Sequence, residues 1–220
     1  MDEKIIWKKR LDATINQLSN QLKIDLYDNT VVEVVRDWFA GSDSISTLNE
    51  TIRIRLEEAW PISQGKIETA FLEFEASLKT GIHKSHGIGS SAALNLAQAE
   101  AEISSSVANV MGSIVAVVSG SIMGGAGIAL LVEGPIGWVI GAVLAGGVFF
   151  FGKKKVQDVL IEPTLRNRRI PAFIKKPAKS KVASELKLNA PKFEEAIFQK
   201  LKEQSAPIYA ALENIPKQNQ

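Results

Sequence analysis

Apolar residues recur every three or four positions through the first eighty residues, and this is the spacing of one helix face. Four such stripes contain Trp7, Leu11, Ile15, Leu18 and Leu22; Val31, Val34, Val35 and Trp38; Leu48, Ile52 and Leu56; and Ile67, Phe71, Phe74, Leu78 and Ile82. A last helix is expected at about 191–213, with Phe193, Ile197, Leu201, Ile208 and Leu212 facing inward. We therefore predict a mainly α fold, a helical bundle with coiled-coil-like packing.

Several boundaries of these helices can be predicted from local signals. Thr30 with Glu33, and Thr47 with Glu50, have the spacing of a capping box, which marks a helix start. Pro61 is expected to end the helix that begins near Thr47, because proline lacks the backbone N–H that a helix interior needs. The alternation of residues 52, 54 and 56 also fits a short strand, so helix and strand both stay open there.

Charged residues disappear from the middle of the chain. Ile103–Val132 holds thirty uncharged residues, Glu133 interrupts, and Gly134–Gly152 adds nineteen more. Eleven of the sixteen glycines lie in these two runs. A helix that crosses the hydrocarbon core of a bilayer needs about 20 apolar residues. We therefore predict two helices, Val107–Val132 and Pro135–Phe151, that form a glycine-rich hydrophobic hairpin inserted in a membrane.

Small residues four positions apart would let the two helices of this hairpin pack closely, as a glycine zipper does in a bilayer. They are Gly112, Ala116, Gly120 and Gly124 on the first helix, and Gly137, Gly141 and Ala145 on the second. Glu133, Gly134 and Pro135 would form the tip, where freed backbone groups need water or lipid headgroups.

Aromatic and basic residues indicate where the hairpin would meet the membrane surface. The aromatic set is Trp138, Phe149, Phe150 and Phe151, and the basic set is Lys153, Lys154, Lys155, Arg166, Arg168 and Arg169. The basic residues would bind lipid headgroups and hold both ends of the hairpin on the cytoplasmic side. The aromatic markers are only about 18 Å apart along a helix, so a shallow or re-entrant hairpin stays open beside a spanning one.

The distribution of charge also points to an anionic surface. Residues 153–181 carry ten Lys and Arg against two acidic residues, although the whole chain has a net charge of only +2. Lipid headgroups are the expected partner, since each basic residue near an anionic membrane contributes about 1 kcal/mol. Phe173 alone could stack on a base in this block, so no specific nucleic-acid partner is expected.

No set of residues in the sequence suggests catalysis, and we expect a protein that is not an enzyme and holds no cofactor or metal. The chain has no cysteine, and its two histidines, His83 and His86, lack a nearby carboxylate partner in sequence. The segment Gly147–Lys154 comes close to a phosphate-binding loop, but Lys154 stands where Ser or Thr should hold magnesium.

The glycine pattern of Gly134–Gly141, with Gly146, Gly147 and the basic end of the hairpin, resembles the C-terminal region of bacterial dynamin-like GTPases. In that family a glycine-rich hydrophobic paddle sits at the tip of a helical bundle and binds membrane. The resemblance covers roughly residues 90–215. It implies a paddle role for Val107–Phe151 and headgroup contact for Lys153–Lys155. Because no complete Walker-type loop is present, it also implies that GTP hydrolysis belongs to a separate partner or has been lost.

These patterns predict four regions: amphipathic helices in 1–90, the membrane hairpin in 91–152, a basic membrane-proximal segment in 153–190, and a C-terminal helix and tail in 191–220. The expected function is anchoring or remodelling of a bilayer, as a homo-oligomer or beside a GTPase partner. The expected location is the cytoplasmic face of a membrane, such as the bacterial inner membrane, because the N-terminal residues do not resemble a signal peptide. A pore-forming or bacteriocin-like effector, and a soluble scaffold subunit whose hairpin a partner buries, remain alternatives.

Overall fold

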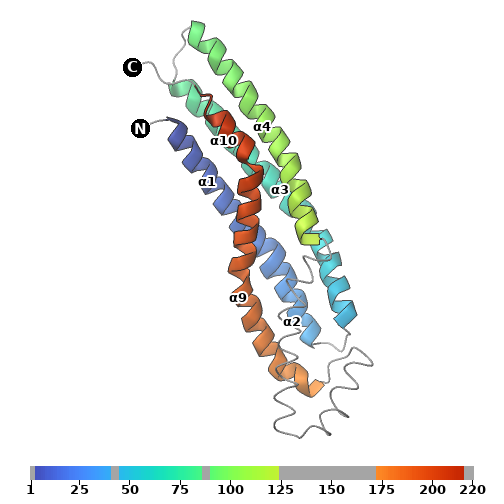
Figure 1. Ribbon diagram of the computed structural model, residues 1–220. Helices are drawn as coiled ribbons and strands as arrows, with labels where there is room; N and C mark the ends of the chain where they lie inside the picture. Colours follow the sequence, from blue (N-terminus) through green and yellow to red (C-terminus); the bar gives the residue numbers. More distant parts are fainter. Residues whose placement is uncertain (1–2, 41–44, 86–89, 124–171, 216–220) are drawn as a thin grey trace. The chain divides into compact units, whose positions relative to one another are not determined.

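The computed structural model describes residues 3–40, 45–85, 90–123 and 172–215, and helices make up all the elements in these ranges (Figure 1). In chain order they are α1 (Glu3–Leu22), the π-helix η1 (Lys23–Val32), α2 (Glu33–Ala40), α3 (Ile45–Ser85), α4 (Ser90–Met123), α9 (Ala172–Gln204) and α10 (Ala206–Leu212). The predicted mainly α fold is confirmed.

The chain forms two compact units, and each is assembled from segments that are distant in sequence. Unit 1 contains Met1–Leu22, Pro61–Ser119 and Glu194–Gln220, and unit 2 contains Lys23–Trp60 and Gly120–Phe193. Both α3 and α9 contribute one part to each unit. The units are described separately below.

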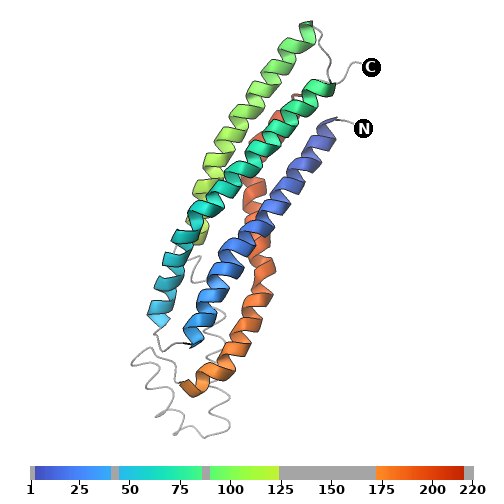
Figure 2. The ribbon, with the colours of Figure 1, turned by 180° about the vertical axis from the view of Figure 1, so that it is seen from behind.

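Unit 1 is a bundle in which α1, the second part of α3, α4, and the end of α9 with α10 lie side by side (Figures 1 and 2). The side-chain contacts that join neighbours are Trp7 to Phe74 (α1 to α3), Glu75 to Ser104 (α3 to α4), Ser113 to Gln204 (α4 to α9) and Asp12 to Tyr209 (α1 to α10). The described helices therefore close into a ring around one core.

The core of unit 1 is built from the apolar stripes that the sequence predicts. The stripe of α1 from Trp7 to Leu22 and that of α3 from Ile67 to Ile82 are buried. Ile197, Leu201, Ile208 and Leu212 of α9 and α10 are buried against them, as expected. Each helix thus contributes a face with period 3.6, which is how apolar area is removed from water in a bundle.

Glycine is required at one position in this core. Trp7 of α1 is 4% exposed, and its ring meets the edge of Phe74 with the ring centres 6.3 Å apart. A Cβ atom on Gly81 would overlap the Trp7 ring. Gly81 therefore allows α1 and α3 to approach closely beside the largest side chain in their contact.

Unit 2 packs η1 and α2 with the first part of α3 and the part of α9 that ends at Phe193. Tyr27 is fully buried, donates a hydrogen bond of 2.9 Å to the backbone carbonyl of Leu186, and lies against the Phe193 ring. Burial, with the nearby charge of Asp28, raises the pKa of Tyr27 to about 12. Tyr27 therefore ties η1 to α9 in its neutral form.

The predicted helix end at Pro61 is wrong. Helix α3 continues through Pro61 to Ser85, because Leu56 and Trp60 before the proline and Ile67 after it belong to one buried stripe. That packing outweighs the cost of about 3 kcal/mol for proline inside a helix. The alternative of a strand at residues 52–56 is excluded as well, since this segment is helical.

The predicted capping boxes do not start helices. Thr30 lies inside η1, and its hydroxyl donates a 2.8 Å hydrogen bond to the carbonyl of Asp25, five residues earlier. Helix α3 begins at Ile45, so Thr47 lies inside it. In both cases the helical pattern starts before the capping residue.

The segment after the hairpin also differs in part from the prediction. The prolines of the basic stretch, Pro163, Pro171 and Pro177, predict loop and short helix there, but from Ala172 onward the stretch is part of one long helix, α9. The expected last helix is instead two helices, because Ser205 separates α9 from α10 and Pro207 occupies the first turn of α10. Proline is well tolerated there, since those N–H groups have no partner inside the helix.

Candidate membrane-contacting helix

Helix α4 presents two faces of different character, and the inward face holds it in unit 1. Its buried residues are Leu96, Ala99, Ile103, Val107, Val110, Ile114 and Val118. These positions are three or four residues apart, the spacing of the a and d positions of a coiled coil. Residues 107–118, which are predicted to begin the first helix of the hairpin, therefore also contribute to the core of the bundle.

Polar contacts at the flanks of this stripe fix the position of α4 in the bundle. The Ser104 hydroxyl donates a 2.6 Å hydrogen bond to Glu75 of α3, and Asn214 donates to both carboxylate oxygens of Glu102. Burial opposes ionisation of Glu75, but the hydrogen bonds from Lys79 and Ser104 outweigh it and lower the pKa of this carboxyl. A charged Glu75 therefore holds Ser104, and with it α4.

The outward face of α4 carries no charged residue from Ile103 to Gly120. Its exposed positions in this stretch are Ser105, Ala108, Asn109, Gly112, Ala116 and Gly120. A Cβ atom on Gly112 or Gly120 would meet no neighbouring atom within 4 Å. The glycines here are therefore not needed for contacts within the described part of the protein.

Length and composition of α4 meet the requirements of a membrane-spanning helix. Among the described residues, the stretch that meets them is Leu96–Gly120 of α4, which has 25 residues and a mean hydropathy of 1.5. A core helix of a soluble protein can meet the same requirements, but it is mostly buried. Only 28% of the apolar stretch of α4 is buried, so much of its surface is available for another apolar environment.

The structure brings together three of the residues predicted to pack the hairpin. Gly112, Ala116 and Gly120 lie on the exposed face of α4, one turn apart. The other predicted site residues lie outside the described residues: Gly124, Gly137, Gly141 and Ala145 of the packing set; Glu133, Gly134 and Pro135 of the tip; Trp138 and Phe149–Phe151 of the interface; and Lys153–Lys155, Arg166, Arg168 and Arg169 of the headgroup set.

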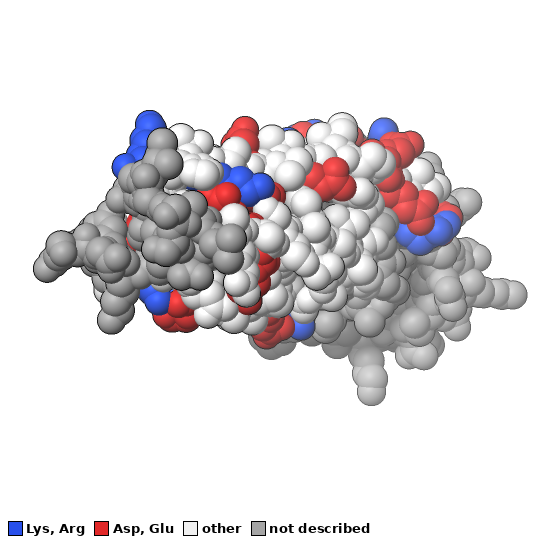
Figure 3. Space-filling view, turned by 90° about the horizontal axis from the view of Figure 1, so that it is seen from above, with Lys and Arg blue, Asp and Glu red and all other residues white. Residues whose placement is uncertain are grey.

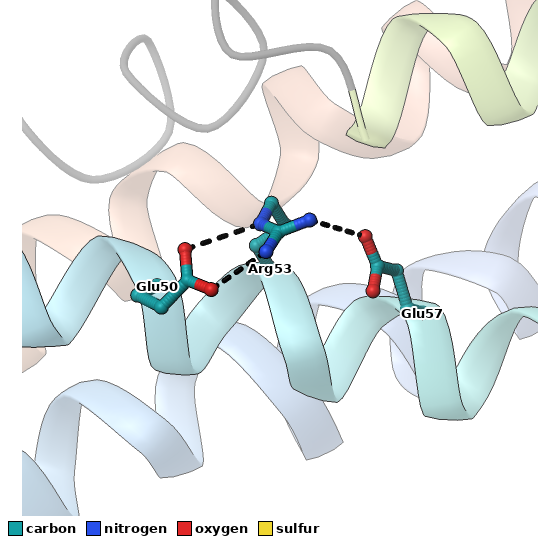
Figure 4. Close-up of polar contacts among 3 residues, drawn as sticks. All are labelled: Glu50, Arg53 and Glu57. Atoms are coloured by element: carbon teal, nitrogen blue, oxygen red, sulfur yellow. Dashed lines mark hydrogen bonds and ion pairs between the residues drawn. The ribbon is translucent and has the colours of Figure 1, made fainter.

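The charged cluster of Glu50, Arg53 and Glu57 has the geometry of solvated ion pairs. Arg53 bonds Glu50 at 2.6 Å and Glu57 at 2.9 Å along the exposed side of α3 (Figure 4). The Arg53 hydrogen bond lowers the pKa of Glu50, and both groups are exposed to water. No group of three or more potential metal ligands occurs in the described ranges.

Basic and acidic side chains are interspersed on the protein face drawn in Figure 3. Neither sign of charge gathers into one field on this face. This is the pattern of a solvated surface, on which opposite charges screen each other. It contrasts with the charge-free outward face of α4.

A second stripe on α3 faces water and is not among the apolar stripes that the sequence predicts. Ile62, Gly65, Thr69, Leu72 and Ala76 are all exposed and uncharged, and we call them the α3 stripe. Beside it, α1 and α3 enclose a groove of about 740 Å³, which we call the α1/α3 groove. In the sequence, the α3 stripe is marked only by uncharged residues spaced three or four positions apart. This signal is weak because three of the five residues are small.

Comparison with protein-family models, with curated proteins and with solved structures finds no match for this chain. Its function must therefore be inferred from the faces of its own helices.

Proposed function

We propose that this protein associates with membranes through α4 and the apolar segment that follows it. In this proposal the hairpin anchors the helical bundle to the cytoplasmic face of a membrane such as the bacterial inner membrane. There it holds or reshapes the bilayer, as a homo-oligomer or beside a GTPase partner. The resemblance to the paddle region of bacterial dynamin-like GTPases suggests this partner class.

One observation carries the proposal: α4 is long and apolar enough to cross a bilayer, and from Ile103 onward its exposed face is uncharged. A helix that served only the core would present charged or strongly polar residues to water on its outer side. From Ile103 onward, α4 presents no charged residue there, only Ser105 and Asn109 with Gly and Ala at the other exposed positions up to Gly120. Small residues of this kind also suit close helix packing in lipid.

Two forces would act together at the membrane. Apolar burial of the hairpin would contribute about 25 cal/mol for each Å² removed from water. The basic residues from Lys153 to Lys181 would add attraction to anionic lipid, about 1 kcal/mol each when they lie near the surface. The second force is screened by salt, so affinity should fall as ionic strength rises.

Flotation with vesicles of phosphatidylglycerol and phosphatidylethanolamine tests the proposal when a deletion variant is compared with the full chain. The deletion should remove residues 124–152 and spare α4, since Val107, Val110 and Val118 belong to the core of unit 1. We expect the full chain to float and the deletion variant to stay in the dense fraction. If neither floats while both keep their helical circular dichroism, the membrane proposal is wrong.

Release of a trapped dye in the same vesicles separates anchoring from pore formation. Binding without release is the result that anchoring predicts. Release at low protein-to-lipid ratios would instead assign the protein to the pore-forming class. Failure to bind lipid, with co-purification of a tightly bound protein, would support the scaffold alternative.

A further inference from the structure

We infer that two copies of this chain associate through the α3 stripe, in an antiparallel pair that fills each copy's α1/α3 groove. The inference goes beyond the proposed function, because it concerns unit 1 alone and requires no membrane. It rests on three features of one surface: exposed apolar residues, small residues beside a groove, and charges arranged in a self-complementary order.

The first feature is apolar exposure in a repeating pattern. Ile62 is 66% exposed and Leu72 is 51% exposed, although α3 already buries a separate stripe in the core. With Gly65, Thr69 and Ala76, these residues recur every three or four positions over about four turns of helix, roughly 21 Å. This is the spacing with which one helix packs against another.

The second feature is the room for a helix to approach. The lining of the α1/α3 groove includes small residues, among them Ala13 of α1 and Gly65, Thr69 and Ala70 of α3, next to larger ones such as Arg10 and Gln17. A Cβ atom on Gly65 would meet nothing within 4 Å. A second backbone can therefore approach α3 closely at Gly65, one turn from the start of the stripe.

The third feature is the order of charges, which indicates that a second copy of this chain occupies the groove. Lys66 and Glu73 both line the groove and are seven residues, or two turns, apart on α3, with Thr69 and Ala70 midway between them. Reversal of a second α3 about that midpoint places each Lys66 beside Glu73 of the second copy. The same reversal places Ile62 near Ala76 of the second copy. A two-fold pair therefore matches opposite charges twice, as an isologous interface requires.

Reversal of the charge at each of these two positions tests the inference. The oligomeric state of the full chain is measured by sedimentation velocity in a mild non-ionic detergent. Wild type is expected to be dimeric. Lys66→Glu alone and Glu73→Lys alone each turn two attractions into two repulsions, and each should raise the dissociation constant by about tenfold or more.

The decisive sample is an equimolar mixture of the two single variants. In a mixed dimer, Glu at position 66 of one copy faces Lys at position 73 of the other, and the unchanged pair also matches. The mixture should therefore recover the dimer that each variant alone has lost. A monomeric wild type, single variants that dimerise as wild type does, or a mixture that stays monomeric would each overturn the inference.

Cross-linking gives a second readout that does not depend on charge. The chain has no cysteine, so Thr69→Cys introduces one thiol per copy at the midpoint. It should form a disulfide with its equivalent on mild oxidation. Asn16→Cys, on an exposed face of α1, is the matched control and should stay reduced. Equal cross-linking at the two positions would contradict the proposed pairing.

Discussion

Helices α1 and α4 belong to the same bundle and bury the same kind of stripe, but their outward faces differ. The exposed positions of α1 include Lys9, Arg10, Asn16 and Asn20. Those of α4 beyond Ile103 are uncharged, and two of them are glycine. The inward faces explain why both helices pack in unit 1. Only the outward faces distinguish a helix that water surrounds from one suited to a second apolar environment.

The largest expected effect comes from placing a charge on the outward face of α4. Ala116→Lys should weaken binding to anionic vesicles by about 100-fold, because a lysine at the centre of a membrane helix costs about 3 kcal/mol. Asn16→Lys on α1 is the matched control, and it should bind as wild type does. Vesicle flotation over a range of lipid concentrations measures both. Equal binding of the two variants to vesicles would contradict the proposed difference between the outward faces of the two helices.

A second pair of variants compares an inward glycine with an outward one. Gly81→Ala should destabilise unit 1 by about 1–3 kcal/mol, because the new methyl group overlaps the Trp7 ring. Gly112→Ala on the open face of α4 should stabilise the helix by up to about 1 kcal/mol. Urea unfolding followed by Trp7 fluorescence, with the other tryptophans replaced by Phe, measures both. Similar shifts for the two variants would contradict the placement of these glycines.

The contact that holds α1 should weaken at alkaline pH. Tyr209 donates a 2.5 Å hydrogen bond to Asp12, and burial together with this carboxylate raises the pKa of Tyr209. A raised pKa means that the folded state keeps a proton which the unfolded state loses at about pH 10, so stability falls as pH rises above 10. Tyr209→Phe should show a smaller loss between pH 9 and 11 than wild type does. Parallel curves for the two proteins would count against this contact.

The contact that holds α4 should instead weaken in acid, by a smaller amount. The pKa of Glu75 is lowered in the folded state, so its contribution is complete above the ordinary value of 4.5 and is lost as pH falls through the lower folded value. Ser104→Ala removes one of the hydrogen bonds responsible. Melting temperatures from pH 6 to pH 3 should therefore fall less steeply in this variant, and an unchanged slope would argue against the bond.

Much of the bundle could be predicted from sequence because burial repeats with the period of the helix. The stripes beginning at Trp7, Ile67 and Phe193 are buried as expected. Local signals were less reliable: Pro61 stays inside α3, and the Thr30 hydroxyl bonds within η1 instead of capping α2. At Pro61 the packing of the buried stripe outweighs the local preference, whereas at Thr30 a second local hydrogen bond, five residues back, replaces capping.

The candidate site could also be predicted only in part. The spacing of Gly112, Ala116 and Gly120 predicts that they share a face, and they do. The sequence did not indicate that the opposite face of the same helix packs in a bundle core, because an uncharged run hides the period of its buried positions. The α3 stripe was missed for a related reason, since Gly65 and Ala76 carry too little apolar surface to mark a face.

The most direct test of the central claim is to attach a polarity-sensitive fluorophore to a single cysteine on each of the two outward faces. Ala116→Cys reports on α4 and Asn20→Cys reports on α1, and the chain has no other cysteine to label. On addition of anionic vesicles, the account predicts a blue-shifted, brighter signal from position 116 and no change at position 20. An unchanged signal at position 116, in protein that floats with the vesicles, would contradict the claim that this face of α4 meets the membrane.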